Sequence, residues 1–131
     1  MDGVSLVGCM RCDDLCPELD AFNETGIWIA DIPGLPEQHL RYPDLFELIE
    51  IPNRSSGTLA IKPAYLSTIL TAKDRMMRRG RWKLVYQPLE AGHVLRLFDL
   101  EDDPACQRDV SSQHPDIKAE LWSCLQRFIA A

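Results

Sequence analysis

The feature that most constrains the fold is an amphipathic helix near the end of the chain, because its apolar side needs a surface to cover. Apolar residues recur there at steps of four, four and three, which places them along one side of a helix: Ile117, Leu121, Leu125 and Phe128. Pro115 and Asp116 are typical of a helix start, so the pattern predicts a helix over 115–129.

A three-stranded antiparallel meander over 74–100 precedes this helix. Residues 81–87 alternate, with Trp82, Leu84 and Tyr86 on one side, as in a half-buried strand that follows a tight turn at Gly80. Residues 94–100 are apolar enough for a central strand. A sheet this small needs its apolar face covered, so we expect the helix to lie across it.

The first half of the chain gives weaker signals. The apolar run 27–30 predicts a further strand near 22–30, and residues 64–72 a short helix. Pro43 and Asp44 open a helical pattern that Pro52 closes. The fold class is α+β, with a small antiparallel sheet. Residues 52–63 have the composition of a loop and linker, so we expect an acidic, proline-rich segment, 1–63, and a second part, 64–131.

Charge is distributed unevenly along the 131 residues. Residues 1–50 hold 11 acidic and 2 basic residues, and the remainder 9 acidic and 12 basic, for a net charge of −6. The acidic balance argues against a dedicated nucleic-acid binder. No apolar run is long enough to span a membrane, and the start of the chain does not resemble a signal peptide, so a cytoplasmic location is the default expectation.

Three of the five cysteines lie close together in a C-x2-C-x3-C-P pattern: Cys9, Cys12 and Cys16. The spacing matches part of a ferredoxin run, but position 6, where a further ligand would stand, is Leu6. With His39 the three thiols could form a structural zinc site. Free thiols in a loop are the simpler interpretation.

The stretch 73–83 is strongly basic, with six basic residues and one acidic residue. With Trp82 and Tyr86 interleaved, it could hold an anion or a single-stranded nucleic acid, although charge runs are usually solvated faces. Its candidates for contact with an anionic ligand are Arg78, Arg79, Arg81 and Lys83.

Two other groups were weighed as chemical sites. The histidines at 39, 93 and 114 all stand near turns, and no motif of nucleophilic catalysis accompanies them. Four acidic residues could bind calcium or magnesium, but the Asp-Pro step beside them favours a turn: Asp99, Glu101, Asp102 and Asp103.

The second half as a whole resembles a known family. Arg78-Arg79-Gly80-Arg81-Trp82-Lys83-Leu84-Val85-Tyr86 is followed by Leu97-Phe98-Asp99-Leu100-Glu101-Asp102-Asp103-Pro104, then by His114-Pro115 and the helix. This order is similar to the C-terminal subdomain of sulfatases, the formylglycine-dependent members of the alkaline phosphatase superfamily. Upstream, Asp2-Gly3-Val4-Ser5-Leu6 and Phe22-Asn23-Glu24-Thr25 resemble preceding segments of the same family.

The resemblance implies a C-terminal portion of a sulfuric ester hydrolase that is structural and shapes the substrate cleft. The family uses formylglycine and calcium or magnesium, but the C/S-x-P-S-R nucleophile motif does not occur here and no metal ligand carries over. The chain alone is therefore predicted to be inactive. Its implied partner is the catalytic domain, along which segment 1–63 would run, and apolar surface left uncovered would favour self-association.

The alternative function is a non-catalytic module with zinc or an iron–sulfur cluster at Cys9, Cys12 and Cys16. A third and weaker hypothesis is an anion- or nucleic-acid-binding hairpin.

Overall fold

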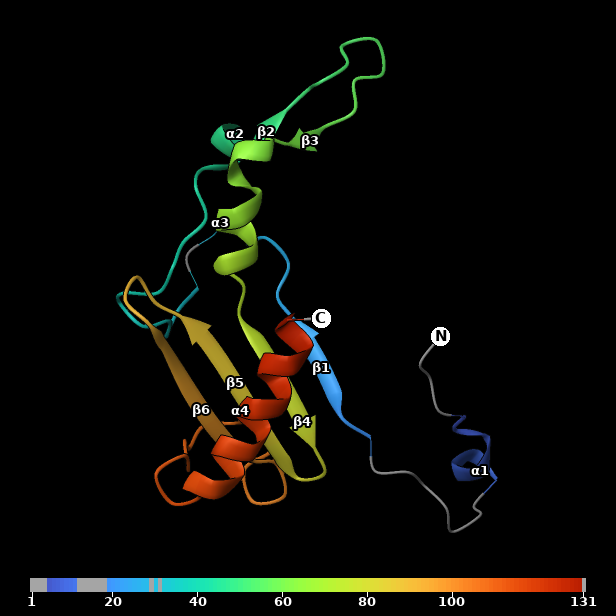
Figure 1. Cartoon of the computed structure of the whole chain (residues 1–131), viewed down its shortest axis with the longest axis vertical. Helices are drawn as coiled ribbons and strands as arrows, with labels where there is room; N and C mark the ends of the chain where they lie inside the picture. Colours follow the sequence, from blue (N-terminus) through green and yellow to red (C-terminus); the bar gives the residue numbers. More distant parts are fainter. Residues whose placement is uncertain (1–4, 12–18, 29, 31, 131) are drawn as a thin grey trace.

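A four-stranded antiparallel sheet with one helix across it forms the lower half of the molecule in Figure 1, a computed structural model that describes residues 5–11, 19–28, 30 and 32–130. The strands are adjacent in the order β1-β4-β5-β6. Their bounds are β1 Ala21–Glu24, β4 Arg75–Arg79, β5 Trp82–Pro88 and β6 His93–Asp99. The helix is α4, Pro115–Ala130. The predicted α+β class, meander and C-terminal helix are confirmed.

Register places one row of side chains against the helix. Met77 is paired with Leu84, and Leu84 with Leu97, so these three residues lie on the same face of the sheet. All three are fully buried, together with Leu121 and Leu125 of α4. Burying each such side chain contributes about 1.5–3 kcal/mol, so this row and the helix stripe hold the two layers together.

The tight turn between β4 and β5 is centred on Gly80 and Arg81. Gly80 has φ +53°, a left-handed conformation that glycine adopts without steric cost. A glycine at the first central position is typical of the type II′ hairpin turn, whose twist matches that of the strands. The main-chain N–H of Leu100 donates to the carbonyl of Arg81 at 2.8 Å, which joins this turn to the end of β6.

The fourth strand begins earlier than the apolar run that predicted it. β1 covers Ala21–Glu24, whereas Ile27 and Trp28 lie outside any strand and residue 29 is not described. Phe22 of β1 stacks on Phe128 of α4 with ring centroids 4.3 Å apart. This contact with the helix, rather than the apolar run, selects the segment that pairs with β4.

The predicted helix between Pro43 and Pro52 is shorter than expected. α2 covers Leu45–Leu48, and Asp44 caps it by accepting a hydrogen bond from the N–H of Phe46 at 2.9 Å. The next two residues form strand β2, Ile49–Glu50, which pairs with β3, Ala60–Ile61. Tertiary pairing therefore ends the helix before Pro52. The short helix predicted over 64–72 is present as η1, Pro63–Tyr65, and α3, Leu66–Thr71.

The elements from α2 to α3 form a separate projection above the sheet in Figure 1, here called the α2–α3 lobe (residues 45–71). Its inner residues Leu48 and Ile69 are buried. Lys62, directly after β3, connects this part of the lobe to α2. Its N–H donates to the carbonyl of Leu48 at 2.9 Å, and its Nζ donates to the carbonyl of Glu47 at 2.7 Å. The lobe thus has a small centre of its own.

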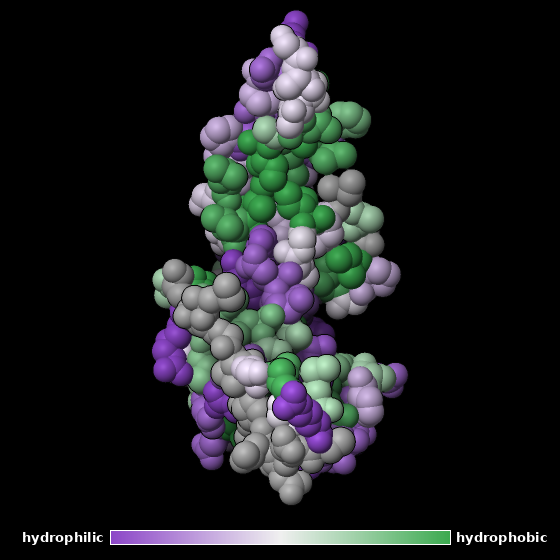
Figure 2. Space-filling view, turned by 90° about the vertical axis from the view of Figure 1, so that its right-hand side faces the viewer, coloured by the Kyte–Doolittle hydropathy of each residue, from purple (hydrophilic) through white to green (hydrophobic). Residues whose placement is uncertain are grey.

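The outer surface of the α2–α3 lobe is strongly apolar. Figure 2 shows hydrophobic side chains gathered over the upper part of the molecule, where Figure 1 places this lobe. Six large apolar residues of the lobe are between 38% and 83% exposed: Leu45, Phe46, Ile51, Leu59, Leu66 and Leu70. A concentration of this kind on one part of a small protein typically marks an interaction surface.

Helix α1, Val7–Met10, lies away from the sheet in Figure 1. Among the described helices, none has the length and hydrophobicity needed to cross a lipid bilayer.

Candidate functional site

The four basic residues predicted to contact an anion do not lie together. Arg79 is paired with Trp82 in the sheet, on the face that α4 covers, whereas Arg78 is paired with Lys83 on the opposite face. Arg81 stands in the turn that joins the two strands. Strand alternation therefore divides the basic stretch into three separate environments.

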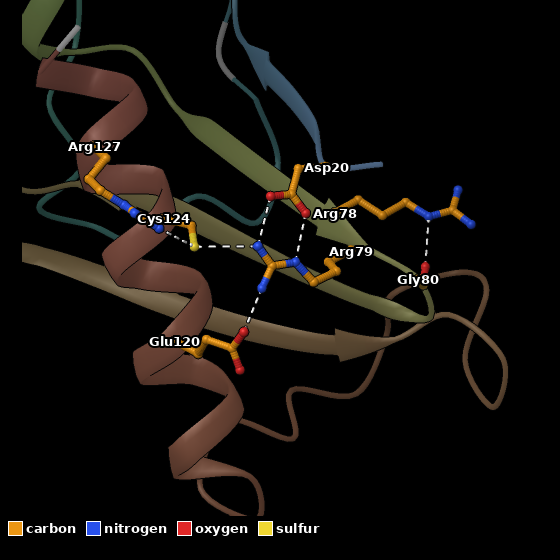
Figure 3. Close-up of polar contacts among 7 residues, drawn as sticks. All are labelled: Asp20, Arg78, Arg79, Gly80, Glu120, Cys124 and Arg127. Carbon is orange, nitrogen blue, oxygen red and sulfur yellow. Dashed lines mark hydrogen bonds and ion pairs between the residues drawn. The ribbon is translucent and has the colours of Figure 1, made fainter. Parts of the chain in front are cut away.

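Arg79 connects three elements through its guanidinium group (Figure 3). Its Nε and Nη2 donate to the two carboxylate oxygens of Asp20, both at 2.7 Å, and its Nη1 donates to Glu120 of α4. The hydrogen bonds from Arg79 hold the pKa of Asp20 below its ordinary value. All of this side chain's charged donors have partners, so Arg79 acts as a structural tie.

The thiol of Cys124 lies beside the same cluster. Its Sγ is 3.5 Å from Nη2 of Arg79 and 3.0 Å from Nη2 of Arg127, one turn along α4 (Figure 3). No local pattern indicates this cysteine, because its cationic neighbours are 45 and 3 residues away and only the packing of α4 on β4 brings Arg79 close.

Arg81 contacts three of the four acidic residues that are candidates for a cation site. It forms an ion pair with Asp99, its Nη1 is 2.7 Å from Glu101, and its Nη2 is 3.4 Å from Asp102. The hydrogen bond from Arg81 lowers the pKa of Asp99. The fourth member, Asp103, accepts a main-chain hydrogen bond from Arg108 at 2.7 Å. These carboxylates close the loop after β6, as the Asp-Pro turn suggested.

The face of the sheet opposite α4, here called the helix-free face, carries the remaining two candidates. Arg78 is exposed and its Nε donates to the carbonyl of Gly80 at 3.1 Å, directed away from the helix in Figure 3. Lys83 is half-buried, and its Nζ lies 3.7 Å from the thiol of Cys106. Arg96 of β6 is also on this face, because its sheet partner is Val85. No local pattern indicates Arg96, because it is a single basic residue within an apolar strand.

A hollow of about 180 Å³ on the helix-free face is lined by Lys83, but not by Arg78 or Arg96. The side chains of Met76 and Val85, which are sheet partners, lie beside it. Its remaining lining residues are polar or charged: Asn23, Thr25, Asp74, Arg75 and Lys83. The helix-free face thus combines an apolar floor, hydrogen-bonding groups and cations, which together suit a small anionic molecule.

His39 directly follows a turn, as predicted, with its N–H donating to the carbonyl of Pro36 at 3.0 Å, but it is buried, at 3% exposure. Its Nε2 lies 2.6 Å from a carboxylate oxygen of Asp74, and its Nδ1 lies 2.6 Å from the carbonyl oxygen of Leu40. Gln87 donates to the other oxygen of Asp74 at 3.3 Å. This pair joins residues 35 positions apart, so no local pattern could have indicated it.

Near His39, the ring of Trp28 packs against both His39 and Tyr42, with centroids 5.6 Å and 5.3 Å apart. Burial raises the pKa of Tyr42. The cluster fixes the segment before the α2–α3 lobe to the end of the sheet.

The other two histidines pack against aromatic rings. His93 packs beside the stacked rings of Tyr86 and Trp122, with centroids 5.3 Å and 4.9 Å away, and His114 lies 4.8 Å from Trp82. Both therefore belong to the contact between the sheet and α4.

The proposed cysteine site falls largely outside the described residues. Cys9 lies in α1, whereas Cys12 and Cys16 are not described, and both ring nitrogens of His39 contact oxygen atoms. Within the described part of the chain, no group of three or more His, Cys, Asp or Glu residues is arranged to hold a metal ion. The zinc or iron–sulfur site stays a prediction.

The comparisons with other proteins do not identify a relative. The chain matches no protein-family signature, no curated protein sequence and no solved structure.

Proposed function

We propose that this chain is the C-terminal portion of a sulfatase-like hydrolase, with a structural and cleft-shaping role and no catalysis of its own. The observation that carries this proposal is where the family-like segments lie. Residues 78–86 and 97–104, which only residues 87–96 separate, come together as paired strands and the loop that follows them. The ion pair between Arg81 and Asp99 joins the two segments.

The parent reaction would be hydrolysis of a sulfuric ester. The family's formylglycine supplies the nucleophile, and its calcium or magnesium ion stabilises negative charge at sulfur. The nucleophile motif is not present in this sequence, and the described acidic residues near the sheet end are engaged by Arg81. No step of the reaction is therefore assigned to a residue of this chain.

The apolar surface of the α2–α3 lobe supports a docking role. Phe46 is 83% exposed and Leu70 57% exposed, and a separate folded unit gains little by presenting such residues to water. In the proposed parent enzyme, the catalytic domain would cover them. The sheet with α4 has its own buried core, so it would remain folded while the lobe makes the contact.

Two measurements test this proposal. The purified chain, mixed with an aryl sulfate and calcium, should hydrolyse no more ester than a sample without protein. Metal-dependent turnover above that level would contradict the proposal. The DNA that precedes the codon for Met1 should encode, in frame, a domain with the C/S-x-P-S-R motif. A stop codon close upstream without that motif would remove the basis for a sulfatase.

A further inference from the structure

Three cations on the helix-free face are neighbours in the sheet, although nothing in the described chain neutralises them. Arg78 and Lys83 are direct partners across β4 and β5. Lys83 is the partner of Phe98, which places Arg96, two residues earlier in β6, diagonally next to Lys83. Like charges opposite one another in a sheet are destabilising, so this arrangement has a cost in the unliganded protein.

The other described cations of the strands and of the turn after β4, together with Lys73, are paired with carboxylates. Lys73 and Arg75 contact Glu24, while Arg79 and Arg81 contact the acidic residues described above. In contrast, Arg78 has only the Gly80 carbonyl and Lys83 only the Cys106 thiol as polar side-chain partners, and Arg96 has none within the described residues. Among the described cations of β4, β5, β6 and the turn after β4, those without a carboxylate partner therefore share the helix-free face.

We propose that the helix-free face binds the oxyanion group of a small phosphate or sulfate ester between Arg78, Lys83 and Arg96. Guanidinium groups bind such oxygens in a bidentate manner, and an ammonium group adds a charge-assisted hydrogen bond. An oxyanion at this place would remove the repulsion between the three cations. The inference does not depend on the proposed sulfatase relationship, since it concerns binding alone.

The hollow next to Lys83 gives the organic part of the ester a place to lie. Asn23, Met76, Val85 and Arg96 form one row across the four strands, so the apolar floor has an amide at one end and a guanidinium at the other. The hollow of about 180 Å³ has the volume of roughly six water molecules. It therefore suits a small organic group.

The one carboxylate that lines this hollow is already engaged. Asp74 contacts His39 through one oxygen and accepts from Gln87 through the other. Glu24, at the end of β1, is held by Lys73 and Arg75. These contacts do not cancel the Asp74 charge, but the local balance is positive because five cations stand near two carboxylates: Lys73, Arg75, Arg78, Lys83 and Arg96 against Asp74 and Glu24. The whole chain, in contrast, has a net charge of −6. Three cations over one small area favour a single oxyanion over a long polyanion such as nucleic acid.

The experiment is a titration of the full chain, labelled with ¹⁵N, with sodium phosphate, phenyl phosphate and sodium chloride at matched ionic strength. We expect both phosphates to shift the amide signals of β4, β5 and β6 around Arg78, Lys83 and Arg96, whereas chloride does not. Phenyl phosphate should bind more tightly than inorganic phosphate, since its ring can cover Met76 and Val85. Equal affinities would overturn the role of the hollow.

Variants identify the binding residues. Lys83→Gln and Arg78→Gln should each weaken phenyl phosphate binding by about tenfold, the usual effect of losing one charge-assisted hydrogen bond. The matched control is Arg54→Gln, an exposed cation in the loop between β2 and β3, which should leave affinity unchanged. Equal losses in all three variants, or shifts that map away from this face, would overturn the proposal.

Two further measurements test the charge repulsion on this face and the class of its ligand. Without phosphate, Lys83→Gln should melt at the same temperature as the native protein or higher, because it removes like-charge repulsion; a marked drop would contradict the unneutralised-cation argument. The second measurement is binding of single-stranded DNA. If the chain binds it more tightly than phenyl phosphate, with a steep dependence on salt, the ligand of this face is a nucleic acid and the proposal is overturned.

Discussion

Arg79 and Asp20 form a bidentate ion pair in which Nε and Nη2 each donate to a carboxylate oxygen at 2.7 Å. Asp20 directly precedes β1, so the pair holds the edge strand against β4 at the point where α4 crosses. Arg78, the adjacent residue, points to the other face and makes no such contact. Arg79 thus ties the edge strand and α4 to β4, whereas the adjacent Arg78 has no carboxylate partner among the described residues.

Removing this pair should reduce stability. We expect Asp20→Asn and Arg79→Gln each to lower the free energy of unfolding by about 0.5–1 kcal/mol, the range for partly exposed ion pairs. Urea denaturation measures the change, and the double variant should cost less than the two single changes together. Arg78→Gln is the matched control and should have no such cost; an equal loss there would contradict the assignment of Arg79 as the structural tie.

Stability should depend on pH through three paired carboxylates. Hydrogen bonds from Arg79, Lys73 and Arg81 lower the pKa values of Asp20, Glu24 and Asp99 respectively. A depressed pKa stabilises the folded state at pH values above the ordinary pKa, here 3.8 for aspartate and 4.5 for glutamate. That stabilisation is lost as the pH falls through the folded-state values.

Urea denaturation between pH 7 and pH 3 tests this expectation. The free energy of unfolding should stay nearly constant down to about pH 5 and then fall, because the unfolded chain binds protons first. Asp20→Asn should make the acid-side slope shallower. An unchanged slope would show that Asp20 gains nothing from Arg79.

The centre of the sheet should be the most sensitive part of the chain. Leu84 is fully buried between Met77 and Leu97, and replacing it with alanine should cost about 2–5 kcal/mol through lost burial and a residual cavity. Leu66→Ala is the matched control, because Leu66 is 49% exposed. Thermal unfolding followed by circular dichroism measures both variants. An equal loss of stability in the two would contradict the assigned core.

The apolar surface of the α2–α3 lobe should drive self-association of the isolated chain. Phe46→Ser and Leu70→Ser should shift sedimentation velocity profiles toward monomer, since they remove exposed apolar area. Ile129→Ser, at the far end of α4, is the control and should leave the profile unchanged. A purely monomeric native chain at high concentration would contradict this prediction.

Metal content separates the sulfatase proposal from the cysteine-site hypothesis. Chain purified without oxygen should contain no stoichiometric zinc or iron, as measured by mass spectrometry. About one metal ion per chain that disappears in Cys12→Ser would favour a site at Cys9, Cys12 and Cys16 instead.

Part of the helix-free face could be predicted from sequence. The basic stretch included Arg78 and Lys83, but it also included Arg79 and Arg81, which form ion pairs with Asp20 and Asp99. Composition cannot separate them, because partners 59 and 18 residues away are not visible to a local pattern. Arg96 was missed for the opposite reason, since it stands alone in its strand.

The sequence by itself determined the meander and the C-terminal helix. The alternation in 81–87 and the spacing from Ile117 to Phe128 are properties of neighbouring residues, and each period fits one backbone geometry. Only the tertiary structure decided that Phe22, not the 27–30 run, enters the sheet, and that Arg78 faces Lys83 while Arg79 faces Asp20. The physical reason is register: a shift of one residue moves every side chain of a strand to the other face, and register is fixed by long-range packing.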